Sequence, residues 1–336
     1  MALSTLTPVL RGMLFSTILA AQGMVWGSAA AAEDTLRSLT AFPSSDATAS
    51  LYDRFVQEVN TRGKGVVQIE VVGGPEAIPG LQQIDAVGRN VVDMTYGPLS
   101  YVLGTMPEAD AWVGSDVPPL VSRENGGFAL IQKIGQEKLG VHILSRFAPA
   151  APVNLWFLKE PKLKENGEID LTGLRLRASP LYNAFYESLG AVPVSIPVPD
   201  VYTGLERGTF DGMGYPASSI DGWGWDKFLK YRLEPSIFQT DLGIYISPKK
   251  WDALSEEART ILTETAAAFE ESSYQEWQSY TKEVTDKLEG NGMQVITLEG
   301  PARDAFVNQA YDSVWARLKA SGSPDYEKLR AAYFSH

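Results

Sequence analysis

One stretch of this chain, residues 174–220, limits most narrowly the folds that it can adopt. Apolar and basic residues alternate at its start, which predicts a strand, and Ser179 followed by Pro180 predicts the first turn of a helix. Two further short strands are expected at 192–196 and 209–213, with a second helix between them. The order strand, helix, strand, helix, strand indicates an α/β protein.

Two side chains of this stretch lie where strands are expected to end. In open α/β sheets, ligands bind outside the carboxyl ends of the strands, and both Arg177 and Tyr215 occupy such ends. A guanidinium there can hold a carboxylate through two parallel hydrogen bonds. The alternative is a solvated arginine or a surface ion pair. Arg175 is two positions away from the strand end and is expected to face solvent.

The composition excludes several kinds of chemistry. The chain has 336 residues, enough for one large or two medium domains, with 44% hydrophobic and 21% charged residues. Its net charge of −12 argues against nucleic acid or an anionic membrane as a partner. No cysteine is present, so disulfides and thiolate chemistry are excluded. With His142 and His336 as the sole histidines, a histidine-based zinc site or a Ser-His-Asp triad is not expected.

The first 32 residues are predicted to be a secretory signal peptide. Arg11 precedes an apolar run at 12–21, and the small residues Ser28–Ala32 offer a cleavage site after Ala32 or a neighbouring alanine. A retained membrane anchor is the alternative, but the run is short and is interrupted by Gln22. No later segment approaches the roughly 18 apolar residues of a membrane span, so an exported protein is expected.

An internal repeat suggests two domains of like topology. Three residues recur 118 positions later (207 − 89, 211 − 93, 216 − 98): Arg89, Asp93 and Pro98 match Arg207, Asp211 and Pro216. In both copies a strand is expected to end in a turn that combines an aromatic residue, glycine and proline. We interpret this as two domains that each present one such turn to a shared cleft. Coincidence between two common α/β turns is the alternative.

Two features beyond this repeat bear on how such domains would connect. Prolines at 149 and 152 bracket an irregular crossing, of the kind in which hinges lie. Phe238 to Ser247 is predicted to form one long strand. Ser255 is predicted to cap a helix that continues to about Leu288, which is long for a globular protein.

The same stretch resembles the second-domain core of the extracytoplasmic solute-binding proteins of TRAP transporters (DctP type). The resemblance rests on the order and spacing of several short pieces: GLRLR at 173–177, LYNAFY, LGAVPV, DVYTGL, RGTFDG and Pro216. It covers most of the chain after the leader and is strongest at 173–216. It implies a two-domain periplasmic-binding-protein fold of α/β class, with hinge strands and a long helix spanning both domains. The implied boundaries are 33–153 plus 243–285 for domain I, and 154–242 plus 286–336 for domain II.

The resemblance also implies a function. Members of this family bind a small organic acid in the periplasm by interdomain closure and deliver it to a small and a large membrane subunit. In that family an arginine at the place of Arg177 holds the substrate carboxylate, and this sequence retains it. The resemblance therefore implies a monomeric binding protein without cofactor, and no enzyme. The alternatives are an exported two-domain α/β hydrolase or lyase, although no G-x-S-x-G elbow is present, and a binding protein of another importer class.

Three departures from the family pattern bear on the ligand. Tyr215 stands where many members have asparagine, and Trp156 where they often have small polar residues. Many members have a second basic residue near the position of Val153. Losing that charge favours a monocarboxylate, and the aromatic residues favour an apolar or aromatic body. The alternatives place Tyr215 under Pro216 and Trp156 in the core.

The remaining candidates are weaker. Ser44, Glu76 and Tyr96 would lie on first-domain loops at the cleft, although a structural role is favoured for each. Further aromatic candidates, each also a potential core residue, are Phe238, Trp112, Trp223 and Trp225. The carboxylate pairs Glu256–Glu257 and Glu270–Glu271 are expected to be charges on a helix surface, because adjacent helix positions do not face each other. Some relatives hold a cation beside the ligand, but their motif is not recognisable here, and no metal site is expected.

Overall fold

The computed structural model describes Met1 and residues 33–147 and 151–335. The predicted signal peptide therefore lies outside the described residues apart from Met1, as does Pro149 of the predicted crossing. From Glu33 onward the described residues form one compact unit, so the predicted domain boundaries remain a prediction. None of the helices described here has both the length and the apolar character that a membrane span requires.

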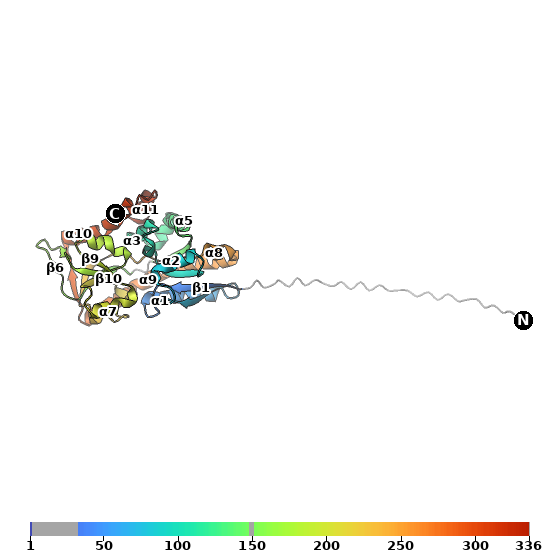
Figure 1. The fold of residues 1–336 in the computed structure, drawn as a ribbon, viewed down its shortest axis with the longest axis horizontal. Helices are drawn as coiled ribbons and strands as arrows, with labels where there is room; N and C mark the ends of the chain where they lie inside the picture. Colours follow the sequence, from blue (N-terminus) through green and yellow to red (C-terminus); the bar gives the residue numbers. More distant parts are fainter. Residues whose placement is uncertain (2–32, 148–150, 336) are drawn as a thin grey trace. The chain divides into compact units, whose positions relative to one another are not determined.

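The first of two large sheets has five strands in the order β2-β1-β3-β12-β4. Its strand β1 is labelled in Figure 1. Its strands are β1 (Asp34–Thr40), β2 (Val67–Gly73), β3 (Met94–Pro98), β4 (His142–Phe147) and β12 (Leu242–Ile246). Strand β1 pairs in parallel with β2 and β3, whereas β12 runs antiparallel to β3 and β4. Strands β3 and β12 are buried at every position, as expected for the centre of a covered sheet.

The second sheet has six strands in the order β13-β11-β5-β10-β8-β9. Its strands are β5 (Val153–Phe157), β8 (Arg175–Ala178), β9 (Val192–Ser195), β10 (Gly212–Pro216), β11 (Tyr231–Ile237) and β13 (Gln294–Thr297). Strands β8, β9 and β10 run parallel, and β5 runs antiparallel to β10 and β11. A separate two-stranded hairpin consists of β6 (Lys162–Leu163) and β7 (Ile169–Asp170).

The two sheets confirm the internal repeat. Strands β3 and β10 begin and end 118 positions apart, each pairs in parallel with one neighbour and antiparallel with the other, and each is followed by a short 3₁₀ helix. The repeated aspartates also act alike, since Asp93 accepts a hydrogen bond from the Arg37 amide and Asp211 from the Arg175 amide. By this correspondence Leu39 on β1 occupies the position that Arg177 has on β8.

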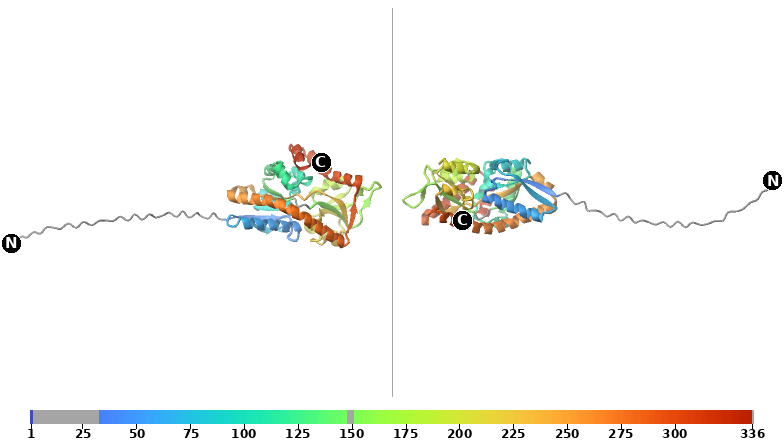
Figure 2. Two further views of the ribbon diagram at one scale, coloured as in Figure 1. Left: turned by 180° about the vertical axis from the view of Figure 1, so that it is seen from behind. Right: turned by 90° about the horizontal axis from the view of Figure 1, so that it is seen from below.

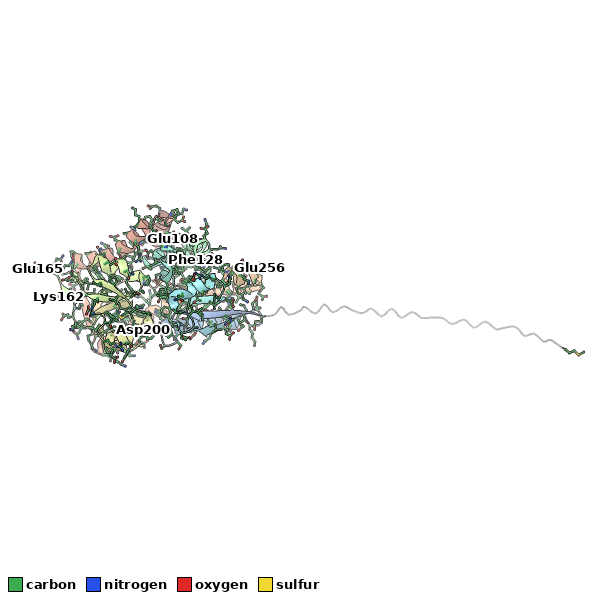
Figure 3. The ribbon with its side chains drawn as sticks, in the orientation of Figure 1. Glu108, Phe128, Lys162, Glu165, Asp200 and Glu256 are labelled. Carbon is green, nitrogen blue, oxygen red and sulfur yellow. The ribbon has the colours of Figure 1, made fainter. Side chains whose placement is uncertain are left out.

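The helices cover these sheets. The α-helices are α1 (Ala47–Arg62), α2 (Gly80–Gly88), α3 (Asp110–Val113), α4 (Pro119–Glu124), α5 (Gly127–Leu139), α6 (Asn183–Ser188), α7 (Val201–Glu206), α8 (Pro248–Ala253), α9 (Glu256–Gly290), α10 (Gly300–Ala320) and α11 (Tyr326–Tyr333). The short 3₁₀ helices are η1 (Leu99–Val102), η2 (Pro107–Ala109), η3 (Pro180–Tyr182), η4 (Val198–Asp200), η5 (Ala217–Ser219) and η6 (Trp225–Lys227). With side chains drawn, Glu256 at the start of α9 and Lys162 on β6 lie at opposite ends of the compact unit (Figure 3).

Helix α9 joins the cores of the two sheets, which confirms the predicted long helix. It has 35 residues, and the Ser255 hydroxyl accepts a hydrogen bond from the Ala258 amide at its start. Its first two thirds, including Leu262 and Phe269, pack in the core of the first sheet. Its last third, including Val284 and Leu288, packs in a core that belongs to the second sheet. Figure 2 shows this helix, in orange, running past both sheets.

Two predicted elements differ in the structure. The strand expected at 238–247 is shorter in the structure, because it is reduced to β12 (Leu242–Ile246), and residues 238–241 connect β11 to β12. Phe238 has φ +36°, a left-handed conformation that cannot continue a strand. The helix expected after Ser179 begins as the 3₁₀ turn η3, and the Ser179 hydroxyl makes no capping hydrogen bond.

A third prediction was wrong. Glu270 was expected on the helix surface, but its side chain is 3% exposed and forms an ion pair with Arg123 at 2.6 Å. Its other oxygen accepts a hydrogen bond from the Arg146 amide on β4 at 2.7 Å. Glu271 does face solvent, as expected. The helix period correctly placed Glu270 and Glu271 on different faces of α9. The sequence did not reveal that β4 covers the face that carries Glu270.

Candidate functional site

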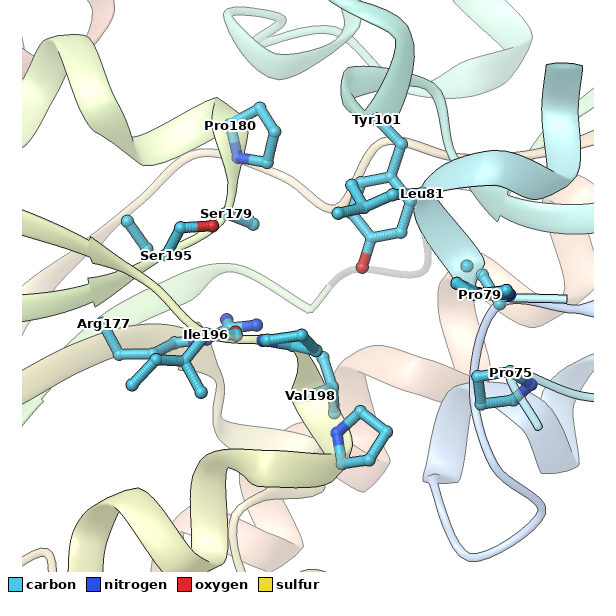
Figure 4. A pocket seen from close by; sticks show the side chains of 15 residues that line it. Pro75, Pro79, Leu81, Tyr101, Arg177, Ser179, Pro180, Ser195, Ile196 and Val198 are labelled. Atoms are coloured by element: carbon cyan, nitrogen blue, oxygen red, sulfur yellow. The ribbon is translucent and has the colours of Figure 1, made fainter. Parts of the chain in front are cut away.

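Two adjoining cavities lie between segments of the first sheet and segments of the second. The outer cavity, about 280 Å³, and the inner cavity, about 50 Å³, share Tyr101, Arg177, Ser179 and Val198 in their walls. Figure 4 shows the outer cavity, with Tyr101 and Leu81 facing Arg177 across it. Pro98 and Pro216, the ends of the two repeated strands, both line the inner cavity. This arrangement confirms that each repeat presents its turn to a shared site.

Arg177 supplies the positive charge of this site. It lies on β8 with only 3% of its surface exposed, and its Nε donates a hydrogen bond to the Ile196 carbonyl at 2.9 Å. That bond fixes the plane of the guanidinium. Within the described chain, its two terminal nitrogens make no hydrogen bond or ion pair. Arg175, two residues earlier, has the same strand parity as Arg177, but it lies at the exposed start of β8 and pairs with Asp211.

Tyr215 stands beside this guanidinium, as predicted. The Arg177 guanidinium carbon lies 6.0 Å from the centre of the Tyr215 ring, within the range of a cation–π contact. Burial raises the pKa of the Tyr215 hydroxyl well above its ordinary value of 10, so it remains a neutral donor. The hydroxyl donates a hydrogen bond to Asp46 Oδ2 at 3.3 Å. Tyr215 therefore forms both an aromatic wall and a link to the first sheet.

Two further tyrosines complete the aromatic wall, and sequence reasoning missed both. Tyr101 on η1 lines both cavities, and Tyr182 on η3 lines the inner one. Burial raises the pKa of Tyr101 to about 12, although the nearby Arg177 lowers it, so its hydroxyl is also a neutral donor. Tyr101 follows the first repeated turn by three residues, and this spacing was the one signal that could have identified it.

Asp46, also missed, connects the two sides of the site. It is the N-cap of α1 and is fully buried, and its Oδ1 accepts a hydrogen bond from the Thr48 amide at 2.8 Å. From the second-sheet side, Trp223 Nε1 donates to Asp46 Oδ2 at 2.6 Å, and Tyr215 donates to the same oxygen. One carboxylate thus holds segments from both sheets together.

Weakening the hydrogen bonds to the Asp46 carboxylate should lower the free energy of unfolding. Because a hydrogen bond to a charged group is worth roughly 1.5–3 kcal/mol, Asp46→Asn and Trp223→Phe should each lower the free energy of unfolding by about 1–2 kcal/mol. Urea unfolding of both variants and of the double variant gives their coupling energy. A coupling of about 1 kcal/mol or more is expected. Fully additive effects would show that this hydrogen bond contributes nothing to stability.

The remaining predicted site residues lie elsewhere. Trp156, Phe238 and Tyr96 are each 0% exposed and belong to the hydrophobic cores, so none lines either cavity. Trp156 is held by its own hydrogen bond from Nε1 to the Tyr215 carbonyl, and Tyr96 stacks on Tyr52. These corrections share one cause, because large aromatic residues near the site also fill the hydrophobic cores.

Two first-domain candidates are at the surface. Glu76 is exposed, and its carboxylate accepts a hydrogen bond from the Gly74 amide at 2.6 Å, so it orders its own loop. Ser44 is exposed in the turn before α1 and lines neither cavity. Of the seven predicted residues, the structure brings together Arg177 and Tyr215. In the part of the chain that the structure describes, no group of three or more acidic or histidine side chains is placed to hold a metal ion.

Comparison with known proteins adds to this geometry. Residues 167–321 match the family described as "Bacterial extracellular solute-binding protein, family 7" (DctP). An uncharacterised protein of Haemophilus influenzae is 30% identical over 200 residues, which span 56% of this chain and 58% of that protein. The "monocarboxylate 2-oxoacid-binding periplasmic protein all3028" of Nostoc sp. is 24% identical over 286 residues, 82% of this chain and 77% of that protein.

The fold has close counterparts among solved structures. DctP7 of Bordetella pertussis, described as an extracytoplasmic solute receptor binding pyroglutamic acid, superposes with a TM-score of 0.79 at 19% identity. The superposition covers 90% of this chain and 99% of that one. The predicted two-domain periplasmic-binding-protein fold is thereby confirmed.

Proposed function

We propose that this chain, which belongs to the DctP family of TRAP-type extracytoplasmic solute-binding proteins, captures a small monocarboxylate with an apolar or aromatic body. In this proposal, the acid binds in the two cavities around Arg177, and the segments of the two sheets close on it. The protein then delivers the acid to the small and large membrane subunits of a TRAP transporter. No bond is made or broken.

One observation carries this proposal. The Arg177 guanidinium is almost completely buried, and among the described residues its terminal nitrogens have no partner. A buried charge without a partner is costly, so an anion in the cavity would stabilise this arrangement. A carboxylate matches the guanidinium in shape and can accept two parallel hydrogen bonds from it. The anion expected here is therefore a carboxylate.

The walls support a single carboxylate on an apolar body. In the described chain, Arg177 is the one cationic residue that lines either cavity. The equivalent position on the first sheet is Leu39, which cannot hold a second anion. Much of the remaining surface comes from tyrosine, proline and valine side chains. The Nostoc relative is named for monocarboxylate 2-oxoacids and the Bordetella structure for pyroglutamic acid, both of which are small carboxylates.

The location and partners belong to the same proposal. The apolar leader at 12–21 and the small residues before Glu33 support export to the periplasm. The protein would act there as a monomer without a cofactor, and the family supports the two membrane subunits as its partners.

A thermal-shift screen over small carboxylic acids tests this function. A ligand that binds the folded state alone, at 100 times its Kd, adds about 2.7 kcal/mol to the free energy of unfolding and raises the melting temperature. The expected result is a hit among monocarboxylates that is recovered unchanged after prolonged incubation with the protein. A hit that is consumed would indicate an enzyme. A screen in which neutral sugars stabilise and acids do not would contradict the proposal.

A further inference from the structure

The inner cavity contains a second polar group besides Arg177. Residues 239–241, between β11 and β12, line it together with Arg177. Asp241 is 2% exposed, and its Oδ2 accepts a hydrogen bond from the Ser100 amide. Gln239 Oε1 is buried and has no hydrogen-bond partner in the part of the chain described here. The preceding residue, Phe238, has φ +36°, a strained conformation that turns this segment out of the strand direction.

Asp241 and Gln239 can accept more hydrogen bonds than the described residues donate to them. An ionised carboxylate can accept about four hydrogen bonds, and the Ser100 amide supplies one to Asp241. Asp46, the other buried carboxylate near the site, receives hydrogen bonds from Thr48, Tyr215 and Trp223 instead. Asp241 and Gln239 are therefore two acceptors that are available to a bound molecule.

The cavity is thus lined by the cation Arg177 and the acid Asp241, which do not neutralise each other. Burial raises the pKa of Asp241, whereas hydrogen bonding by Ser100 lowers it. Within the described chain, Arg177 and Asp241 form no ion pair, although both line a cavity of about 50 Å³. Both charges also act on the same two hydroxyls, those of Tyr101 and Tyr182. A carboxylate ligand is attracted to Arg177 and repelled by the ionised form of Asp241, which hydrogen bonding by Ser100 favours. Its stable orientation places a hydrogen-bond donor, and not a second oxygen anion, beside Asp241.

From this we infer that the ligand is a monocarboxylate that also carries an N–H or O–H donor, and that Asp241 and Gln239 accept hydrogen bonds from this donor. The inference rests on the proposed function, because it assumes that the carboxylate binds Arg177. It divides small acids into two classes. Hydroxy, amino and N–H heterocyclic acids can pair their carboxylate with Arg177 and their donor with Asp241 and Gln239. An acid without a donor would leave the buried oxygens of Asp241 and Gln239 unpaired. A site that is built to accept a hydrogen bond from its ligand strongly disfavours an analogue that lacks the donor.

Matched pairs of acids test the inference by titration calorimetry on the intact chain. Pyrrole-2-carboxylate and furan-2-carboxylate have nearly the same shape, but the first has an N–H where the second has an ether oxygen. Mandelate and phenylacetate, and lactate and propionate, differ in the same way by one hydroxyl. In each pair that binds, the donor-bearing member should bind at least tenfold more tightly.

Variants of Asp241 and Gln239 test whether these residues cause the preference for acids with a donor. Asp241→Asn and, separately, Gln239→Met should reduce the tenfold preference to threefold or less, while a donor-free acid retains its affinity. Using both variants guards against a folding defect, because Asp241 also receives the Ser100 amide. Asp312→Asn, an exposed carboxylate on α10, is the matched control and should leave the preference unchanged.

The outcomes separate this inference from the proposed function. Equal affinities within the pairs, with binding still lost on removal of Arg177, would overturn the donor inference alone. A donor preference that survives both Asp241→Asn and Gln239→Met would overturn the assignment to these two residues. If no acid of any pair binds at 10 mM, the proposed capture of small monocarboxylates fails together with the inference.

Discussion

Replacing Arg177 with alanine should weaken binding of the cognate acid by about 10- to 150-fold. A hydrogen bond to a charged group contributes roughly 1.5–3 kcal/mol, and each 1.4 kcal/mol is a factor of ten in Kd. The guanidinium is buried, with its Nε fixed on the Ile196 carbonyl. No other cationic residue of the described chain lines either cavity, so none is placed to replace it. Titration calorimetry with the acid found by screening measures this loss directly.

Two further variants make the result specific to the guanidinium. Arg175→Ala removes an arginine from the same strand, but that side chain faces solvent and pairs with Asp211, so affinity should stay within twofold. Arg177→Lys keeps the charge but cannot offer two parallel donors, and its affinity should fall between those of the wild type and the alanine variant. If Arg177→Ala binds as tightly as Arg175→Ala, the carboxylate is held by another group.

Replacing Glu270 with alanine should lower the free energy of unfolding by about 3–5 kcal/mol, the cost typical of breaking a buried ion pair by removing one partner. Glu270 accepts hydrogen bonds from the Arg123 guanidinium at 2.6 and 2.8 Å and from the Arg146 amide at 2.7 Å. The Arg146 guanidinium itself is fully buried, with its Nε and one terminal nitrogen unpaired within the described chain. Removing Glu270 leaves this cluster with excess positive charge.

The neighbouring carboxylate provides the control for this prediction. Glu271 is exposed on the same helix and contacts Gln275, so Glu271→Ala should change stability by less than about 0.5 kcal/mol. Urea unfolding of both variants, monitored by tryptophan fluorescence, gives the comparison. Equal midpoints for Glu270→Ala and Glu271→Ala would show that the ion pair with Arg123 has no net effect on stability.

Local patterns predicted the features that depend on the chain alone. The repeat at a spacing of 118 correctly indicated two sheets of like topology, because β3 and β10 carry the same turn and the same aspartate contact. Position along the expected strand separated the exposed Arg175, near its start, from the buried Arg177, near its end. The capped, periodic segment after Ser255 predicted α9 to within two residues of its observed end.

The features that were missed depend on contacts between distant segments. Asp46 contacts residues about 170 to 180 positions away, and Asp241 contacts Ser100. No pattern within one segment encodes such pairs. Trp156 was a candidate for stacking on the ligand and Tyr96 for a loop at the cleft, but Trp156 lies within β5 and Tyr96 within β3, and both pack in the cores. The sequence therefore predicted the position of the charge and did not predict most of the wall.

The most direct test of the account is a crystal structure of the protein with its acid bound. We expect one carboxylate oxygen within about 2.7–2.9 Å of each terminal nitrogen of Arg177, in the geometry of a paired guanidinium and carboxylate. The body of the acid should lie against Tyr101 and Tyr215. An acid bound with its carboxylate away from Arg177, or a guanidinium that stays unpaired in the complex, would contradict the account.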